Sequence, residues 1–189
     1  LQRDLGLTTI YVTHDQEEAL ALSTRIAVIN HGQVVQQGEP RVIYEQPIDA
    51  FVAAFIGRAN LLPATVESVT EHRIRLIIDS GAILDIAPPA KPVSAAPMRT
   101  GDSLSLSIRP EAIQVSDADG QSSGAQAMIG RIAASAYQGA FVEYEIEVDG
   151  LALKARVANP KGKQLYQRGA AGKLTFAAEH LVIIPKSGN

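Results

Sequence analysis

The beginning of the chain alternates between apolar runs and helical periodicity. Thr8 to Val12 is rich in β-branched residues and predicts a buried strand. Asp15 and Glu18 have the spacing of a capping box, so a helix is expected from Gln16 to Ser23. His14 would then stand at the carboxyl end of a strand and directly before a helix N-terminus. In open α/β sheets, ligands bind at that position.

The next residues predict a hairpin and two short helices. Arg25 to Asn30 forms an apolar strand, and His31-Gly32 is a turn signal that leads into a second strand. Gly57 is a natural helix C-cap, and we place a domain boundary there, between residues 1–57 and 58–189. The other elements expected before this boundary are a strand at Gln33 to Gln37 and helices at Arg41 to Glu45 and Ile48 to Ile56.

Beyond Gly57 the pattern changes to short alternating strands that are separated by turn signals, which is typical of an all-β domain. Two stretches without regular periodicity interrupt it, a Pro/Ala-rich one from Pro88 to Arg99 and a Gly/Ser/Asp-rich one from Ser116 to Gln126. The expected strands are Leu62–Val69, Arg73–Asp79, Ala82–Ile86, Ser103–Ile108, Ile113–Val115, Ile129–Ala134, Glu143–Val148, Ala152–Val157, Gly172–Phe176 and Val182–Ile184.

The β-rich part divides into two similar halves, at about residues 58–116 and 127–189. Ile74 to Ile78 has the apolar period of Val142 to Ile146, and Pro110 to Val115 has that of Ala178 to Ile183, both at an offset of 68 residues (142 − 74 and 178 − 110). We interpret the halves as OB-like half-barrels that arose by duplication. The expected fold class is mainly β, with a duplicated OB-like barrel domain after a smaller α/β segment.

Composition narrows the classes of function. The chain has 189 residues, no cysteine and a net charge of −3. Acidic and basic residues are interspersed, which argues against nucleic acid as a partner because that would require a basic face. Zero cysteines exclude disulfides and thiolate metal sites. No apolar run approaches the length of a membrane span.

The amino-acid sequence of the first segment resembles that of a known family. Tyr11 to Leu20, followed by Arg25 to Val34, is similar to the switch-histidine region of ABC-transporter ATPases, and the likeness runs almost continuously from Leu5 to Gly57. The resemblance implies that His14 contacts the γ-phosphate of ATP and the attacking water, in a site that a second subunit closes. His14 is the only residue that we assign to ATP chemistry, because Asp15 is better explained as the helix cap.

The second part resembles the TOBE regulatory domain of importers of the maltose, polyamine, iron and sulfate type. Leu106 to Glu111 and Tyr137 to Tyr144 carry this likeness. It implies a homodimer that works with transmembrane permease subunits, in the cytoplasm on the inner face of the cell membrane, with ATP and Mg as cofactors of the full-length protein. On the resemblance of the sequence from Phe55 to Leu62, the transported solute would be ferric iron or a polyamine.

The ATPase motifs that normally precede the switch histidine do not occur in this chain. It contains no Gly-x-x-x-x-Gly-Lys-Ser/Thr, no Leu-Ser-Gly-Gly-Gln loop and no acidic Walker B strand, and it does not begin with Met. We therefore expect a C-terminal fragment of a longer ATPase that does not hydrolyse ATP by itself. With so much of the ATPase sheet missing, Thr8 to Val12 and Arg25 to Asn30 would lack their parallel neighbours. We therefore predict a dimer, either with or without exchange of residues 1–57 between the two chains.

Several alternatives stay open. The alternative function is a stand-alone OB-like binding module for a small oxyanion or nucleic acid, which the balance of charges opposes for nucleic acid. Arg109-Pro110-Glu111 has two interpretations, an Arg–Glu pair across a turn or a contact with a small ligand or partner. No metal site is expected, since His14, Asp15 and Glu18 match no zinc-ligand spacing. The three remaining histidines are expected to be solvated, His31 in a turn and His72 and His180 on strand edges.

Overall fold

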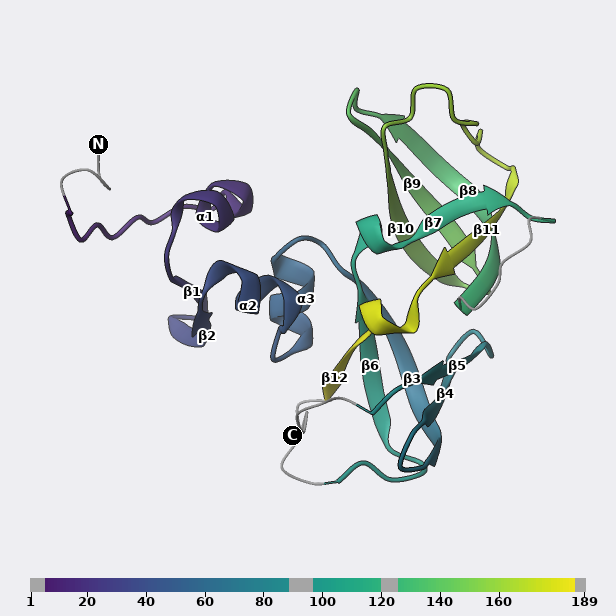
Figure 1. The fold of residues 1–189 in the computed structure, drawn as a ribbon, viewed down its shortest axis with the longest axis horizontal. Helices are drawn as coiled ribbons and strands as arrows, with labels where there is room; N and C mark the ends of the chain where they lie inside the picture. Colours follow the sequence, from purple (N-terminus) through teal and green to yellow (C-terminus); the bar gives the residue numbers. More distant parts are fainter. Residues whose placement is uncertain (1–5, 89–96, 120–125, 186–189) are drawn as a thin grey trace.

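The computed structural model describes residues 6–88, 97–119 and 126–185. An N-terminal segment of short helices and one hairpin extends to one side of a larger β-rich body, which contains two sheets (Figure 1). Among the described residues, no helix has the length and apolar character needed to cross a bilayer. We expected the end of a helix over Leu1 to Leu7, and most of this range lies outside the described residues. The central parts of the two irregular stretches, after Ala87 and Asp119, also lie outside them.

Local sequence signals account for the N-terminal elements. Helix α1 (Gln16–Leu22) begins where the Asp15 carboxylate accepts a hydrogen bond from the Glu18 amide at 3.1 Å, which confirms the predicted cap. Strands β1 (Ile26–Asn30) and β2 (Gln33–Gly38) form the predicted antiparallel hairpin. Helices α2 (Pro40–Glu45) and α3 (Ala50–Phe55) follow, and a small core holds the segment together: Ile26, Val28, Ile43, Val52 and Ile56.

The predicted strand at Thr8–Val12 is wrong. Residues 7–13 have no regular secondary structure, and the side chains of Ile10 and Val12 are each 91% exposed. A strand needs a neighbouring strand to satisfy its backbone N–H and C=O groups, and no described residue supplies one here. The apolar run of β1 forms a strand because β2 lies next to it.

The β-rich body consists of two antiparallel five-stranded sheets, and the fold class is mainly β as predicted. Their orders are β12-β6-β3-β4-β5 and β10-β9-β8-β11-β7. Short 3-10 helices, η1 (Pro110–Ala112) and η2 (Ala178–His180), precede the last strand of each half. The strands are β3 (Asn60–Val69), β4 (Ile74–Ile78), β5 (Ile83–Ile86), β6 (Ser103–Ile108), β7 (Gln114–Asp117), β8 (Gln126–Tyr137), β9 (Phe141–Val148), β10 (Leu151–Ala158), β11 (Ala171–Phe176) and β12 (Val182–Pro185).

The two halves exchange their last strands. The sheet built from β3 to β6 is completed by β12, and the sheet built from β8 to β11 is completed by β7 (Figure 1). One hydrophobic core therefore runs through both sheets, from Leu62 in β3 to Ile183 in β12. Because each half supplies the fifth strand of the other, neither half closes its own sheet.

The predicted 68-residue repeat is confirmed for the last two strands of the two repeats, but the hairpins at their beginnings have a different offset. β6 and β11 begin 68 residues apart (171 − 103), and so do β7 and β12 (182 − 114). In the hairpins, Val66 faces Leu76 whereas Ile132 faces Ile146, so the hairpin of β8 and β9 is four residues longer. Tyr144 consequently corresponds to Ile74, two residues away from the predicted alignment. An even shift preserves the alternation of apolar side chains, so periodicity alone does not reveal it.

Two smaller expectations also change. His72 lies in the turn between β3 and β4 and His180 in η2, so neither is on a strand, although both are exposed. Gly139 lies in the β8–β9 turn with φ of 73°. The bulge of β8 falls between Ile132 and Ala134.

Candidate functional site

His14, the sequence-predicted site residue, lies on the exposed surface of the N-terminal segment. It is the last residue before the α1 N-cap, and the Asp15 amide beside it donates to Thr13 Oγ1 at 2.9 Å. Within the described part of the chain, the imidazole makes no hydrogen bond and no ion pair. Both ring nitrogens are therefore available to a group from outside this chain.

The helix that follows His14 is held from two directions. Gln16 Oε1 accepts a hydrogen bond from the Gly57 amide at 3.0 Å, which ties the first turn of α1 to the end of α3. Tyr11 Oη donates to Glu18 Oε2 at 2.7 Å, and this contact with Glu18 raises the pKa of Tyr11. His14 is thus fixed relative to α3, even though its own side chain is free.

The chemistry available at His14 is limited to what an exposed imidazole supplies. An imidazole at a helix N-terminus can donate a hydrogen bond to a phosphate oxygen or orient a water molecule. No described set of three His, Cys, Asp or Glu side chains is placed to hold a metal ion. The structure brings no second predicted catalytic residue next to His14.

A second cluster joins the N-terminal segment to the β-rich body, and it is centred on Arg109. The Arg109 guanidinium donates to the backbone oxygens of Ala53 (3.1 Å), Ile56 and Tyr44, and it lies 4.0 Å from the centre of the Tyr44 ring. These oxygens belong to the C-terminal ends of α2 and α3, where helix carbonyls lack intrahelical partners and favour a cation. We call Arg109, Tyr44 and Glu111 the arginine clamp.

The predicted Arg109–Glu111 pair across the turn is wrong. Glu111 Oε1 instead accepts a hydrogen bond from Tyr44 Oη. Arg109 and Glu111 therefore contact the same residue of α2, Arg109 through the Tyr44 carbonyl and Glu111 through the Tyr44 hydroxyl. Both side chains thus contact the N-terminal segment of the same chain, and the second interpretation, contact with a small ligand or a separate partner, stays a prediction.

Burial and charge both act on the clamp. Burial, followed by the hydrogen bond and charge of Glu111, raises the pKa of Tyr44 to about 12. Burial lowers the pKa of Arg109, and the interactions with Tyr44 and Glu111 oppose that shift. Gly57 allows the close approach, because a Cβ there would lie 2.5 Å from Tyr44 Cε2 and 3.0 Å from Arg109 Nη1.

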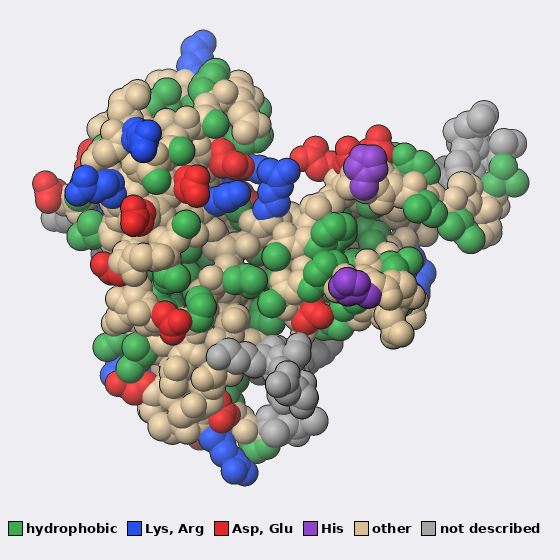
Figure 2. All heavy atoms as spheres, turned by 180° about the vertical axis from the view of Figure 1, so that it is seen from behind, with side chains coloured by type: hydrophobic (Ala, Val, Ile, Leu, Met, Phe, Trp, Pro, Cys, Tyr) green, Lys and Arg blue, Asp and Glu red, His purple; other side chains and the backbone are tan. Residues whose placement is uncertain are grey.

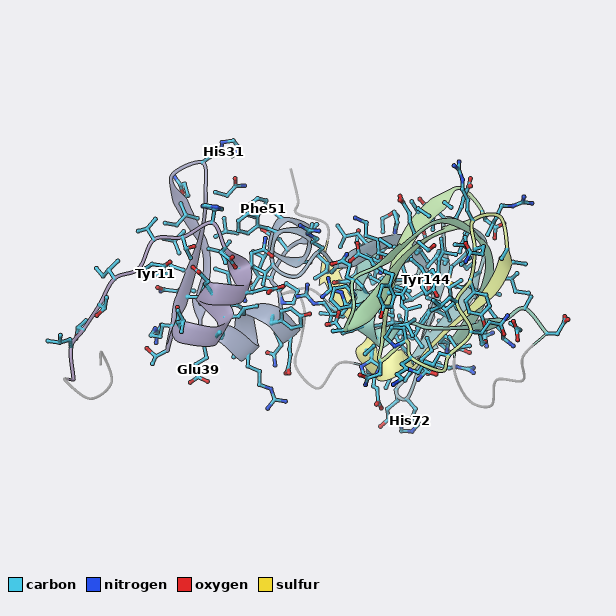
Figure 3. The ribbon with its side chains drawn as sticks, turned by 90° about the horizontal axis from the view of Figure 1, so that it is seen from above. Tyr11, His31, Glu39, Phe51, His72 and Tyr144 are labelled. Carbon is cyan, nitrogen blue, oxygen red and sulfur yellow. The ribbon has the colours of Figure 1, made fainter. Side chains whose placement is uncertain are left out.

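Sequence reasoning missed Tyr44. Its position in a short helix with one buried face resembles that of any other core aromatic, and no spacing rule links it to Arg109, 65 residues later. The clamp, the Gly57 amide and Gln16 form a connected path from the β-rich body to the helix next to His14. The view from above in Figure 3 shows the N-terminal segment and the β-rich body meeting at a narrow contact.

Comparison with known proteins identifies the β-rich part. The model of the family described as TOBE domain matches residues 106–184. This chain carries a TOBE domain. The matched residues include the clamp carboxylate Glu111, both 3-10 helices, the exchanged strand β7 and all but the last residue of the exchanged strand β12.

Relatives with sequence similarity extend through the N-terminal segment as well. The chain is 37% identical to the spermidine/putrescine import ATP-binding protein PotA of Frankia alni, over 98% of this chain and 41% of the relative. It is 40% identical to PotA of Pseudomonas aeruginosa (96% and 50%) and 42% identical to the Fe(3+) ions import ATP-binding protein FbpC of Rhizobium etli (79% and 38%). Over nearly its whole length, the chain is homologous to the C-terminal parts of ATP-binding subunits of ABC importers. It spans about half the length of these relatives, or somewhat less.

A solved structure gives the fold of the TOBE region independently. The molybdate-bound form of the molybdate-binding protein ModG superposes with a TM-score of 0.59, over 67% of this chain and 95% of ModG. The sequences are only 13% identical, so the likeness shows the fold alone.

Proposed function

We propose that this chain is the C-terminal part of the ATP-binding subunit of an ABC importer, and that it carries the switch histidine, His14, together with the regulatory TOBE domain. The full-length protein would couple ATP hydrolysis to the import of a solute. The observation that carries the proposal is the alignment over 98% of the chain with a polyamine-import ATP-binding protein, which includes the N-terminal segment. A free-standing TOBE module would not require similarity in residues 6–57.

In this proposal His14 contacts the γ-phosphate and positions the attacking water. An exposed imidazole directly before a capped helix suits that role, because hydrogen-bond donors oriented toward developing charge lower the barrier without reorganisation. The sequence has no Gly-rich phosphate loop, so ATP and Mg would be held mainly by parts of the full-length protein that precede these residues. The residues of this chain orient a water molecule and donate a hydrogen bond; the triphosphate and its metal supply the charge that they act on.

Partners follow from the same proposal. The full-length subunit would form a homodimer and bind permease subunits on the cytoplasmic face of the membrane. The support in the structure is the exposed apolar stretch before α1, where the side chains of Ile10 and Val12 lie in solvent with no covering element in the described part of the chain. Such side chains favour burial against another protein surface. The names of the relatives support a polyamine or ferric iron as the solute.

A stand-alone oxyanion-binding module is the second candidate, and the fold shared with ModG is the observation that favours it. The charges of the TOBE domain give it little support. Figure 2 shows acidic and basic side chains interspersed on the face in view, with no continuous basic surface. Nucleic acid is disfavoured for the same reason, at a net charge of −3.

The deciding experiment is His14→Ala in the full-length protein, with His31→Ala as the matched control in an exposed turn. ATP turnover should fall by about a hundredfold or more, because a lost positioning group costs several kcal/mol of barrier. Nucleotide affinity should change little, and His31→Ala should retain full turnover. Equal losses of binding and turnover would contradict the switch role. Calorimetric titration of the chain with molybdate and sulfate tests the second candidate, which requires stoichiometric binding.

A further inference from the structure

The second sheet leaves a seam where β7 and β10 lie side by side at its two edges without hydrogen-bonded pairing. A cavity of about 340 Å³ opens at this seam. That volume suits a small molecule, since ligand pockets generally begin at about 300 Å³. Val115 and Val157 form apolar walls, and polar side chains line the rest of the cavity.

Two tyrosines form its inner wall. Tyr144 is 1% exposed, and its hydroxyl accepts a hydrogen bond from the Tyr166 amide at 3.3 Å. No acceptor in the described part of the chain takes the Tyr144 hydroxyl hydrogen, which leaves a buried donor for a ligand. The Tyr166 ring packs edge-on against Tyr144 at 6.1 Å, and burial, with the charge of Asp117 next, raises the pKa of Tyr166 (Tyr144 is labelled in Figure 3).

Opposite charges stand at the mouth of the cavity. Asp117 Oδ1 accepts a hydrogen bond from Gln164 Nε2 at 3.1 Å, and Lys163 Nζ donates to the Ala158 carbonyl at 2.8 Å. Both Asp117 and Lys163 are exposed, and no ion pair within 4.0 Å joins them. A side-chain hydrogen bond also joins Tyr166 to the Asp117 carboxylate. Each charged group still keeps capacity for a further partner, because a carboxylate has more acceptor sites than these two contacts use and Lys163 keeps its remaining ammonium hydrogens.

We call the sheet β12-β6-β3-β4-β5 the first barrel and the sheet β10-β9-β8-β11-β7 the second barrel. The first barrel provides an internal comparison, because the residue equivalences can be read from hydrogen bonds. Gly101 and Gly169 donate to the carbonyls of Val66 and Ile132, so the two turns correspond and Met98 matches Tyr166. Hairpin register matches Ile74 to Tyr144, and the exchanged strands match Ile184 to Ser116 and Pro185 to Asp117.

The same seam is apolar in the first barrel. Ile74 and Ile184 are 2% and 1% exposed, and Met98 packs against the core. The second barrel therefore has polar residues where the first has apolar ones. The hydroxyls of Tyr144, Tyr166 and Ser116 and the carboxylate of Asp117 take the positions of Ile74, Met98, Ile184 and Pro185, in that order. The first barrel folds with apolar residues at these positions, so its packing needs no polar residues there. The polar residues at these positions of the second barrel line an open cavity, which indicates a ligand-binding site.

We propose that the seam cavity of the second barrel binds a small zwitterion of amino-acid type, with its ammonium at Asp117 and its carboxylate at Lys163. The Tyr144 hydroxyl donates to the ligand from the inner wall, and Val115 and Val157 contact its carbon chain. A ligand with one charge would leave the opposite charge of the rim without a partner, which lowers its affinity. The site belongs to the second barrel alone and does not depend on the function proposed for His14.

Calorimetric titration with four probes tests the site: L-leucine and 4-aminobutanoate as zwitterions, 1,4-diaminobutane as a dication and butanedioate as a dianion. At least one zwitterion should bind with 1:1 stoichiometry, about tenfold more tightly than either the dication or the dianion. Asp117→Asn and Lys163→Gln should each weaken that binding about tenfold, and Tyr144→Phe should weaken it without unfolding the protein. Asp149→Asn and Lys161→Gln, in neighbouring exposed turns, should leave it unchanged.

Four results would overturn the proposal. One is the absence of heat from both zwitterions at millimolar concentration, and another is equal affinity for all four probes. Tighter binding of the dication or the dianion would show that one rim charge has no role. Unchanged binding in Asp117→Asn and Lys163→Gln would place the ligand elsewhere.

Discussion

The Asn60 side chain forms both hydrogen bonds of a strand partner with the backbone of Lys154. Asn60 Nδ2 donates to the Lys154 carbonyl at 2.8 Å, and Asn60 Oδ1 accepts from the Lys154 amide at 2.7 Å. Asn60 begins β3 in the first sheet, whereas Lys154 lies on β10, an edge of the second sheet. One amide side chain thus satisfies an edge that would otherwise have unpaired backbone groups, and it joins the two barrels.

Replacing Asn60 should destabilise the whole β-rich body. Asn60→Ala leaves a partly buried N–H and C=O of Lys154 without partners, at a cost of about 2–4 kcal/mol. Asn60→Asp should be at least as damaging, because a carboxylate cannot donate to the Lys154 carbonyl. Chemical denaturation measures the loss. Asn30→Ala in the β1–β2 hairpin is the control and should change the free energy of unfolding by about 0.5 kcal/mol or less. An equal effect of both alanine variants would show that the Asn60 contact contributes nothing particular.

Loss of the arginine clamp should release the N-terminal segment. In Arg109→Ala the end carbonyls of α2 and α3 lose a cationic donor, which we expect to cost about 3 kcal/mol at this contact. Limited proteolysis within residues 6–57 should accelerate by more than about tenfold, since each 1.4 kcal/mol changes the open population tenfold. Arg109→Lys should rescue only part of the effect, because one compact ammonium cannot reach three carbonyls in a fixed geometry.

Arg41→Ala is the matched control for the clamp. Arg41 is 82% exposed and pairs with Glu45 one helical turn away at 2.8 Å, in the same helix that the clamp contacts. Exposed pairs of this kind contribute about 0.5 kcal/mol or less. Proteolysis rates of Arg41→Ala should therefore match those of the unaltered protein. If Arg109→Ala behaves in the same way, the clamp does not hold the segment.

Alkaline pH should weaken the clamp in a defined window. The folded-state pKa of Tyr44 is raised to about 12, by burial first and by Glu111 second. Because the folded pKa lies above the unfolded value of about 10, the stability contributed by Tyr44 is complete below pH 10 and is lost as the pH rises toward 12. In Glu111→Gln the neighbouring negative charge is gone, so the pKa of Tyr44 should fall toward its ordinary value. Absorbance titration at the phenolate band measures this, with Tyr44→Phe to assign the transition.

Two glycines that face each other across β8 and β11 should respond differently to alanine. Gly130 and Gly172 are register partners. A Cβ on Gly130 would lie 2.7 Å from the Glu147 carbonyl oxygen, so Gly130→Ala requires a backbone shift and should cost about 1–3 kcal/mol. A Cβ on Gly172 meets its nearest neighbour at 3.4 Å, which is ordinary contact, so Gly172→Ala should be near neutral or stabilising. Thermal unfolding distinguishes the two, and a reversed order would contradict the packing around β8.

Local chemistry in the sequence determined most of the element boundaries to within two residues. The strand predicted at Ser103–Ile108 is β6 to the residue, and the predicted cap at Asp15 and turn at His31-Gly32 are present. Such features depend on a few neighbouring residues, through alternation, capping and turn geometry, so a sequence specifies them directly. The TOBE family, the resemblance to ABC importer subunits and the mainly β fold class were likewise apparent in the motifs and are confirmed.

Tertiary structure alone decided which strands meet. Alternation tells which face of β7 or β12 is buried, but not that each completes the sheet of the other half, because a strand edge accepts any partner in register. The apolar run at Thr8–Val12 has the composition of a strand and lacks the neighbour that would make it one. Arg109 donates to carbonyls more than fifty residues away in the sequence. Burial, pairing and long-range hydrogen bonds depend on where distant segments come together, and no local pattern encodes that.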